Sequence, residues 1–346
     1  MKKILVTGGL GYIGSHTVVA LQLAGFEVVI IDNLSNSSLD VLHRIEKITG
    51  IQPQFEELDL RDKPATISFF EKHSTIDGII HFAASKAVGE SVTNPLLYYE
   101  NNLSTLITIL QQVQHKEHIS FIFSSSCTVY GQAEKMPISE NAPIQKAISP
   151  YGNTKQIGEE ILQDTAKIAP GLHVISLRYF NPIGAHASTE IGELPRGIPQ
   201  NLVPFITQTA IGLRKELAVF GNDYPTEDGT CIRDYIHVVD LAEAHVVALK
   251  RLINDQQETS FEVFNIGTGK GSSVLEVIKS FERVSQQKLN YKIVDRREGD
   301  VISAYADTTK ANTILGWKAQ STLDEAMLSA WKWEQKIRKT NEPNLK

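Results

Sequence analysis

The sequence predicts an α/β fold: a doubly wound parallel sheet, joined to a smaller C-terminal α/β domain. In the first half of the chain, short apolar runs alternate with helical patterns, and the runs lack the strict polar alternation of half-exposed strands. Such runs are typical of strands that are buried on both faces of a parallel sheet. Since strand–helix–strand units cross over with a right hand, their repetition favours helices on both faces of that sheet.

Six apolar runs are the expected strands of this sheet. They are Ile4–Val6, Val28–Asp32, Gln54–Glu57, Gly78–Phe82, Ile119–Ser124 and His173–Arg178. Three helix starts lie between them, because Ser37-x-x-Asp40 matches a capping box, and Asn94-Pro95 and Ser149-Pro150 each place an N-cap residue before a proline. Gly25 is expected to end the first helix.

The pattern changes after Arg178, where a second unit is expected to begin. It is expected to begin with a loop rich in Pro and Gly over Phe180–Arg196, followed by a helix from Pro204 to about Lys215. An amphipathic helix over Val238–Leu252 and a strand over Phe261–Ile266 are expected next. A capped helix from Thr322-x-x-Glu325 towards Ile337 is the last expected element. The strand is expected to return to the large sheet. We therefore expect a nucleotide-binding domain over 1–180 and a substrate domain over 181–346, with about 234–268 packing back on the first domain.

Composition narrows the classes of function. The chain has 346 residues, 42% of them hydrophobic, which is enough for about two domains with buried cores. Its 34 Lys and Arg against 40 Asp and Glu give a net charge of −6, which argues against a nucleic-acid-binding protein. It has no run of about 18 apolar residues, so no membrane span is expected. With two cysteines, Cys127 and Cys231, and no signal-peptide pattern, the expected location is the cytoplasm.

The ten histidines show no spacing typical of metal ligands, so no metal is expected. His115 and His118 lie near an expected helix end, and His237 and His245 are too far apart to be the two histidines of a zinc-binding helix motif. Cys127 is interpreted as a small packing residue rather than a nucleophile.

A glycine-rich turn follows the first expected strand. Gly9-Leu10-Gly11-Tyr12-Ile13-Gly14 opens a helix, and Gly8 offers the alternative spacing Gly8-x-x-Gly11-x-x-Gly14. Such glycines allow a tight turn and a close approach of the backbone to a pyrophosphate, which the helix N-terminus then faces. Asp32 closes the second strand, where a carboxylate accepts ribose hydroxyls and repels a 2′-phosphate. The pattern predicts a dinucleotide-binding (Rossmann) domain that prefers NAD to NADP.

The predicted chemistry lies on the helix that follows Ser149-Pro150. Tyr151 and Lys155 are four residues apart and therefore share one face of this helix. A phenol titrates near pH 10, so a tyrosinate base at neutral pH needs its pKa lowered by about three units. Three positive charges are expected to lower this pKa together: the Lys155 ammonium group, the partial charge of the helix N-terminus and an oxidised nicotinamide ring. With Ser124-Ser125-Ser126 at a strand end, these residues predict hydride transfer to or from a secondary alcohol, with a tyrosine base.

At this point the chain resembles the extended short-chain dehydrogenases, and within them the branch that acts on UDP-hexoses. The resemblance covers nearly the whole chain, and long runs carry it: Thr7–Gly14, Asp32–Ser37, His81–Ala84 with Lys86, Ala87–Ser91, Tyr98–Asn102, Phe123–Gly131, Tyr151–Lys155, Arg178–Pro182, Phe220–Thr226, Asp228–Thr230, Arg233–Val238 and Arg296–Asp300. These runs are more specific than the glycine pattern alone.

The resemblance implies an isomerase of galactose and nucleotide-sugar metabolism. The implied reaction is the reversible epimerisation of UDP-glucose and UDP-galactose at C4, through a 4-keto sugar, with tightly bound NAD. Tyr151 would take the proton of the 4-hydroxyl, Ser126 would hold that oxygen, and Lys155 would bind the nicotinamide ribose and lower the pKa of Tyr151. Because the sugar must turn over between the two hydride transfers, the UDP must be held tightly and the hexose loosely.

The resemblance also assigns a set of binding residues. Those assigned to the cofactor are Gly8, Gly11, Tyr12, Ile13, Gly14, Asp32, Asn33, Leu34, Ser35, Asn36, Ser37, Asp59, Leu60, Phe82, Ala83, Ala84, Lys86, Asn101, Ser126, Tyr151, Lys155 and Phe180. Those assigned to the substrate are Ser126, Tyr151, Asn181, Asn201, Leu202, Ala218, Val219, Phe220, Arg233, Arg297, Asp300 and Ala304. The two arginines suit the diphosphate.

A homodimer is implied as well, through the helices that begin at Pro95 and Pro150. The sequence offers an apolar stripe at helical spacing, made of Leu103, Leu106, Ile107 and Leu110. The stripe fits either a partner subunit or the chain's own sheet.

Two other functions remain open at this point. A nucleotide-sugar 4,6-dehydratase begins with the same oxidation but needs a carboxylate pair near the serine, whereas Ser126-Cys127-Thr128-Val129-Tyr130 contains no acid. A non-catalytic NAD sensor or scaffold on the same fold needs no tyrosine base.

The substrate range is a further hypothesis. Relatives restricted to the two plain UDP-hexoses carry a bulky aromatic residue at the position that aligns with Ala304. We hypothesise that the methyl group of Ala304 leaves room for the N-acetylated sugars UDP-GlcNAc and UDP-GalNAc. The alternative is that a neighbouring side chain fills this space.

Overall fold

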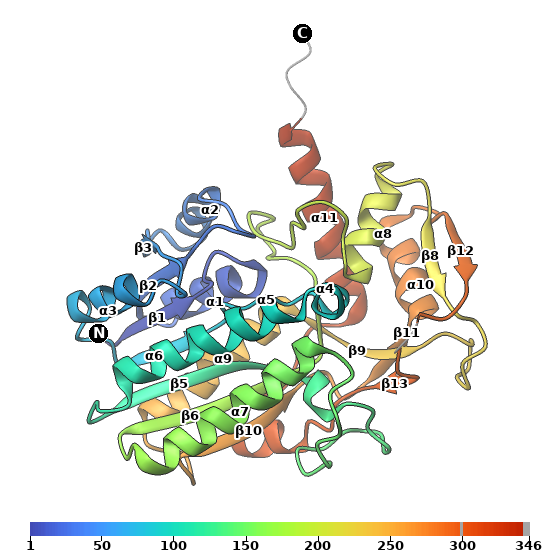
Figure 1. The fold of residues 1–346 in the computed structure, drawn as a ribbon. Helices are drawn as coiled ribbons and strands as arrows, with labels where there is room; N and C mark the ends of the chain where they lie inside the picture. Colours follow the sequence, from blue (N-terminus) through green and yellow to red (C-terminus); the bar gives the residue numbers. More distant parts are fainter. Residues whose placement is uncertain (298–299, 342–346) are drawn as a thin grey trace.

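The central sheet has seven strands and is parallel throughout. The computed structural model describes residues 1–297 and 300–341, so Glu298 and Gly299 of the Arg296–Asp300 run lie outside the described residues. The strand order is β10-β6-β5-β4-β1-β2-β3, and helices cover both faces (Figure 1). The strands are β1 (Lys3–Thr7), β2 (Glu27–Asp32), β3 (Gln54–Glu57), β4 (Gly78–His81), β5 (Ile119–Ser126), β6 (Leu172–Tyr179) and β10 (Phe261–Ile266). The predicted fold class, a doubly wound parallel sheet, is confirmed.

Each face of the sheet has its own apolar core, because successive side chains of a strand point to opposite faces. In β1, Ile4 and Val6 pack beneath one helical layer, whereas Leu5 packs beneath the other. The first layer is made of α1 (Tyr12–Leu23), α2 (Asp40–Thr49) and α9 (Val238–Ile253), and the second of α3 (Lys63–Lys72), α6 (Thr105–Val113) and α7 (Pro150–Ile168). None of the helices in the described part of the chain is both long and apolar enough to cross a membrane.

Short elements connect the sheet to these layers. Helices α4 (Val88–Thr93) and α5 (Pro95–Tyr99) lead through the π-helical turn η1 (Glu100–Ser104) into α6. The 3-10 turn η2 (Cys127–Tyr130) follows β5 directly. The π-helical turn η3 (Ala311–Leu315) packs against α9 and β10.

The second unit contains two small sheets and three helices around a separate core. Strand β9 (Ile232–His237) pairs with β7 (Asn181–Ile183), β11 (Gly271–Ser273) and β13 (Ser303–Ala304). Strand β8 (Leu217–Phe220) pairs with β12 (Tyr291–Val294). Helices α8 (Leu202–Ala210), α10 (Val274–Ser285) and α11 (Leu323–Asn341) surround this core, which contains Val219, Phe281 and Trp331.

The chain returns from the second unit to the large sheet. Strand β10 has the bounds predicted for Phe261–Ile266, and it pairs in parallel with β6. Helix α9 packs against α1 on the first layer. The division of the chain into two units is therefore not a single cut in the sequence.

Two local predictions were wrong. Helix α2 begins at Asp40 after Leu39, and the Ser37 hydroxyl instead donates a 2.7 Å hydrogen bond to Oδ1 of Asp32, so Ser37-x-x-Asp40 is not a capping box. Helix α8 begins at Leu202 and ends at Ala210, since Gly212, with a φ of +86°, turns the chain before Lys215.

Candidate active site

The glycine-rich turn is packed closely at Gly8, Gly9 and Gly14, where an added Cβ atom would lie less than 3.0 Å from a neighbouring atom. Gly8 has a φ of +67°, and a Cβ atom there would lie 2.9 Å from the Ala83 nitrogen. A Cβ atom on Gly14 would lie 2.2 Å from the Gly8 carbonyl oxygen. Gly11 caps α1 without a side-chain bond, so the amino end of the helix is open to an anion. Both Gly8 and Gly9 are therefore required by the packing of the turn, and Gly8 also by its positive φ.

Asp32 lies at the carboxyl end of β2, beside this turn. One of its oxygens, Oδ2, accepts a 3.1 Å hydrogen bond from the Leu10 backbone nitrogen. The other, Oδ1, accepts hydrogen bonds from the Leu34 nitrogen at 3.0 Å and from the Ser37 hydroxyl at 2.7 Å. The carboxylate is 8% exposed and is held in one orientation at the strand end, where strand order also reverses around β1.

The other expected cofactor residues line the same edge of the sheet. They are Tyr12 and Ile13 in the first turn of α1, Asn33 to Asn36 after β2, Asp59 and Leu60 after β3, Phe82 to Ala84 and Lys86 after β4, Asn101 in η1, and Phe180 after β6. Salt bridges fix Asp59 and Lys86 of this set, and burial fixes Leu60. The Arg61 guanidinium holds the pKa of Asp59 at about 2, Lys86 faces Glu193 with its Nζ 3.6 Å from Oε1, and Leu60 packs in the core.

Tyr151 and Lys155 come from the start of α7, as the sequence predicted. The Ser149 hydroxyl accepts a 3.2 Å hydrogen bond from the Gly152 nitrogen and caps the helix. Lys155 is 4% exposed, and its Nζ donates a 2.6 Å hydrogen bond to the Ser124 carbonyl oxygen near the end of β5. This Nζ also lies 5.8 Å from the centre of the Tyr151 ring. The ammonium group therefore lies between the helix and the strand end that carries Ser126.

The protein side chains do not by themselves make Tyr151 a base. Burial raises the pKa of Tyr151 to about 12, and hydrogen bonding with Ser126 opposes this rise only in part. Burial also lowers the pKa of Lys155 to about 8, while Glu159 works in the opposite direction. At neutral pH these residues hold a neutral phenol beside a lysine that is still largely a cation.

Beneath Lys155 lies a buried ion pair that sequence reasoning missed. Arg178 on β6 binds Glu159 on α7, with Nη2 2.5 Å from Oε2, and both side chains are under 10% exposed. The Ser125 and Ser176 hydroxyls also donate to Glu159, at 2.6 and 2.8 Å. The signal available in the sequence was the spacing of Glu159, four residues after Lys155 and so on the same helix face.

Asn102 is a second residue that sequence reasoning did not assign to the site. Its side chain accepts a 2.8 Å hydrogen bond from the Ser85 nitrogen and donates 3.0 Å hydrogen bonds to the Ser85 oxygen and the Thr154 hydroxyl. Its neighbour Asn101 donates to the Ser85 hydroxyl at 3.0 Å. Asn102 thus fastens the loop after β4 to α7, between Tyr151 and Lys155.

The residues assigned to the UDP lie on the second unit. Arg233 on β9 pairs with Asp300, with Nη2 2.6 Å from Oδ1, and the Arg297 guanidinium lies 4.5 Å from the centre of the Phe220 ring. Ala218 and Phe220 on β8 are partly exposed, whereas the Val219 side chain packs in the core and leaves only its backbone for a ligand. Asn201, Leu202 and Asn181 lie at the starts of α8 and β7.

Ala304 lies on β13 opposite Arg233 of β9. It is 9% exposed and packs in an apolar cluster with Val129 and Phe180, which connects it to the sheet edge that carries Ser126. The ring of its neighbour Tyr305 lies against Gly271, where an added Cβ atom would be 3.1 Å from it. The Tyr305 ring is therefore directed at β11.

Comparisons with known proteins agree with this arrangement. A model of the GDP-mannose 4,6 dehydratase family matches residues 5–329. The chain is 50% identical over 331 residues to the UDP-glucose 4-epimerase of Bacillus subtilis (strain 168), and this match covers 96% of each protein. A UDP-glucose 4-epimerase structure from Stenotrophomonas maltophila, with bound NAD and formylated UDP-arabinopyranose, matches at 46% identity and a TM-score of 0.94 over 98% of this chain and 100% of that one. A UDP-glucose 4-epimerase structure from Bifidobacterium longum, in complex with NAD+ and UDP, matches at 44% identity and a TM-score of 0.92. This match covers 97% of this chain and 99% of that one.

Proposed function

This chain belongs to the UDP-glucose 4-epimerase family, and we propose that it interconverts UDP-glucose and UDP-galactose at C4 with NAD as its cofactor. One observation carries the proposal most directly: buried Lys155 bonds to the Ser124 carbonyl oxygen at the strand end that carries Ser126. Tyr151 lies on the same helix, one turn before Lys155. This arrangement brings an acid–base group, a cation and a hydroxyl to one edge of the sheet.

The residues at the glycine-rich turn fit NAD. Gly8 and Gly14 leave the turn without side chains, as close approach of a pyrophosphate requires, and the start of α1 faces it. Asp32 has two oxygens that accept ribose hydroxyls, and its negative charge disfavours a 2′-phosphate. When bound, NAD supplies the oxidising chemistry by accepting the C4 hydrogen as hydride and returning it.

The chain's own residues would then move one proton. Tyr151 takes the proton of the 4-hydroxyl and gives it back, while the Ser126 hydroxyl holds the same oxygen. Burial raises the pKa of Tyr151 to about 12, so proton removal by this phenol needs positive charge beside it. Lys155 supplies one such charge at neutral pH, because its pKa of about 8 keeps most of the population protonated.

The UDP and the hexose would be held differently. Arg233 and Arg297 offer guanidinium groups to the diphosphate, and Arg233 already lies in an ion pair with Asp300. The hexose end faces the apolar cluster of Val129, Phe180 and Ala304, which offers little directional bonding. A 4-keto sugar held mainly by its UDP is free to present its other face.

The turn after Ser126 lacks the carboxylate that a 4,6-dehydratase needs there. The turn η2 after Ser126 consists of Cys127, Thr128, Val129 and Tyr130, and the Tyr130 hydroxyl already donates a 2.6 Å hydrogen bond to Asn265. Burial raises the pKa of Cys127 to about 11, which disfavours a thiolate there. These residues do not provide the carboxylate pair needed to eliminate water.

We also propose that the chain works as a cytoplasmic homodimer. Val88, Val92 and Leu96 on α4 and α5 are 47%, 61% and 78% exposed, an apolar surface on the side where a partner is expected. In the stripe on α6, Leu106 and Leu110 pack into the chain's own core, whereas Ile107 is 41% exposed. Light scattering should give twice the chain mass. A monomer at micromolar concentration would contradict the dimer.

The function is tested with purified full-length protein, UDP-galactose and no added NAD. We expect UDP-glucose to form, and the same final ratio of the two sugars to be reached from either starting sugar. Bound NAD without any conversion would favour the NAD sensor instead. A product that has lost one water would favour the dehydratase.

A further inference from the structure

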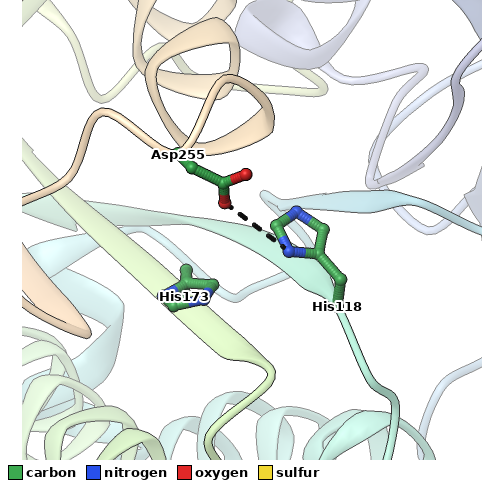
Figure 2. A group of neighbouring side chains, drawn as sticks. All are labelled: His118, His173 and Asp255. Atoms are coloured by element: carbon green, nitrogen blue, oxygen red, sulfur yellow. Dashed lines mark ion pairs between the residues drawn. The ribbon is translucent and has the colours of Figure 1, made fainter.

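Three side chains with metal-ligating groups meet at the edge of the sheet opposite the active site. They are His118 just before β5, His173 on β6 and Asp255 after α9 (Figure 2). One ligand atom from each residue lies within 4.8 Å of the other two, and Nδ1 of His118 is 3.8 Å from Oδ1 of Asp255. Sequence spacing gave no sign of this group, because the pairing of β5 with β6 and the return of the chain after α9 bring the residues together.

We propose that His118, His173 and Asp255 bind one Zn²⁺ ion per chain. Two imidazoles and one carboxylate are a donor set typical of Zn²⁺, which is four-coordinate and would take water as its fourth ligand here. Tetrahedral ligands about 2.1 Å from the ion lie about 3.4 Å from one another. The donors must therefore move closer by up to about 1.4 Å, and the side chains of His118 and Asp255, 37% and 71% exposed, have room to move.

His173 also has a ring nitrogen without a partner in the part of the chain that the structure describes. Its Nδ1 atom is buried and has no hydrogen-bond partner among the described residues. Such an atom costs free energy unless a ligand or a water satisfies the ring.

The site is separated from the chemistry of the enzyme. Strand β5 runs from Ile119 beside the cluster to Ser126 in the active site, seven residue steps or roughly 23 Å at about 3.3 Å per step. A bound ion would join the starts of β5 and β6 to the turn after α9, and this role is structural. Epimerase activity and metal binding are therefore expected to vary independently.

The test uses tag-free, full-length protein treated with a chelator and then dialysed against Zn²⁺. We expect about one Zn²⁺ per chain by elemental analysis, a rise in the melting temperature with Zn²⁺, and the visible absorption bands of four-coordinate Co²⁺ when Co²⁺ is used instead. His118→Ala and Asp255→Asn should each weaken Zn²⁺ binding by more than about 10-fold. Loss of a residue that only hydrogen-bonds to a metal ligand already lowers metal affinity by about 10-fold or more, and loss of a ligand itself should lower it further. Asn suits the positive φ of +52° at position 255.

His43→Ala is the matched control, because His43 is an exposed histidine on α2 whose Nδ1 lies 3.6 Å from a single carboxylate oxygen, that of Glu46. It should bind Zn²⁺ as the wild type does, and all three variants should convert UDP-galactose at the wild-type rate. The proposal is overturned if wild-type protein binds no Zn²⁺ at micromolar concentrations. It is equally overturned if the two cluster variants bind as tightly as wild type, or if His43→Ala weakens binding as much as they do.

Discussion

The Nζ of Lys155 donates a 2.6 Å hydrogen bond to the carbonyl oxygen of Ser124, two residues before Ser126 on the same strand. This bond joins the first turns of α7 to the carboxyl end of β5. It holds the lysine where burial lowers its pKa to about 8, within reach of the Tyr151 ring. This contact thus fixes the position of Lys155 relative to Tyr151 and the strand end that carries Ser126.

The buried lysine predicts a specific dependence of stability on pH. The folded pKa of Lys155 is about 8 and the usual value is 10.5, so between these values the unfolded chain binds more protons and the free energy of unfolding rises with pH. The shift corresponds to roughly 3 kcal/mol. We expect wild type to gain this amount relative to Lys155→Met between pH 8 and pH 10.5, as measured by denaturant unfolding at several pH values. Equal pH dependence in both proteins would contradict the shift.

Gly14→Ala should abolish tight NAD binding. The added Cβ atom would lie 2.2 Å from the Gly8 carbonyl oxygen, and the turn must move to relieve this clash. We expect the NAD recovered from purified protein, measured by chromatography after denaturation, to fall by more than about 10-fold, since a shift of the turn costs the pyrophosphate its hydrogen bonds. Gly89→Ala is the control, because a Cβ atom at Gly89 meets nothing within 4 Å. An unchanged NAD content in Gly14→Ala would show that the turn tolerates a methyl group.

Asp32→Asn should weaken the preference for NAD over NADP. The amide keeps the shape and the oxygen that accepts from Leu34 and Ser37, loses the hydrogen bond from the Leu10 nitrogen, and removes the charge that repels a 2′-phosphate. A hydrogen bond to a charged group is worth about 1.5 to 3 kcal/mol, so the affinity ratio should fall by about 10-fold or more. Competition of the two nucleotides for cofactor-stripped protein measures this ratio. No change would place the ribose away from Asp32.

Ala304→Tyr should narrow the substrate range. Ala304 packs in the apolar cluster with Val129 and Phe180, so a tyrosine ring at this position would take up room that an N-acetyl group needs beside this cluster. We expect kcat/KM for the N-acetylated UDP-sugars, relative to the plain UDP-hexoses, to fall by at least about 10-fold. Assays with all four UDP-sugars give this ratio. A ratio equal to that of wild type would refute the hypothesis for Ala304.

Local patterns were sufficient for the parallel sheet. Each of the predicted strands is within two residues of its observed bounds at either end, because buried parallel strands are short apolar runs bounded by turn residues. The strands of the second unit were missed, apart from β10. Strand β13 has two residues, and β9 reads Ile-Arg-Asp-Tyr-Ile-His, where the buried Asp234 accepts hydrogen bonds from the loop nitrogens of Thr268 and Gly269 and so breaks the apolar pattern.

Among the functional residues too, local patterns predicted some and could not predict others. Tyr151, Lys155 and the glycine-rich turn are local in sequence, and their spacing was enough to find them. Glu159 with Arg178, Asn102 with Thr154, and His118 with His173 are pairs formed across elements. Strand register and helix packing create such pairs, and spacing along one sequence does not contain that information.

The protonation of Tyr151 includes a cost that sequence reasoning left out. That reasoning counted the cations near the phenol but not the cost of burying a phenolate. In the protein, burial outweighs the Ser126 hydrogen bond, and the pKa rises to about 12.

Replacement of Tyr151 by phenylalanine tests the central claim most directly. Phe keeps the ring beside Lys155 and removes only the hydroxyl that exchanges a proton with the sugar. With saturating UDP-galactose and an unchanged NAD content, we predict that kcat for Tyr151→Phe falls by about 10²- to 10⁴-fold. A variant that forms UDP-glucose at the wild-type rate would contradict a tyrosine base.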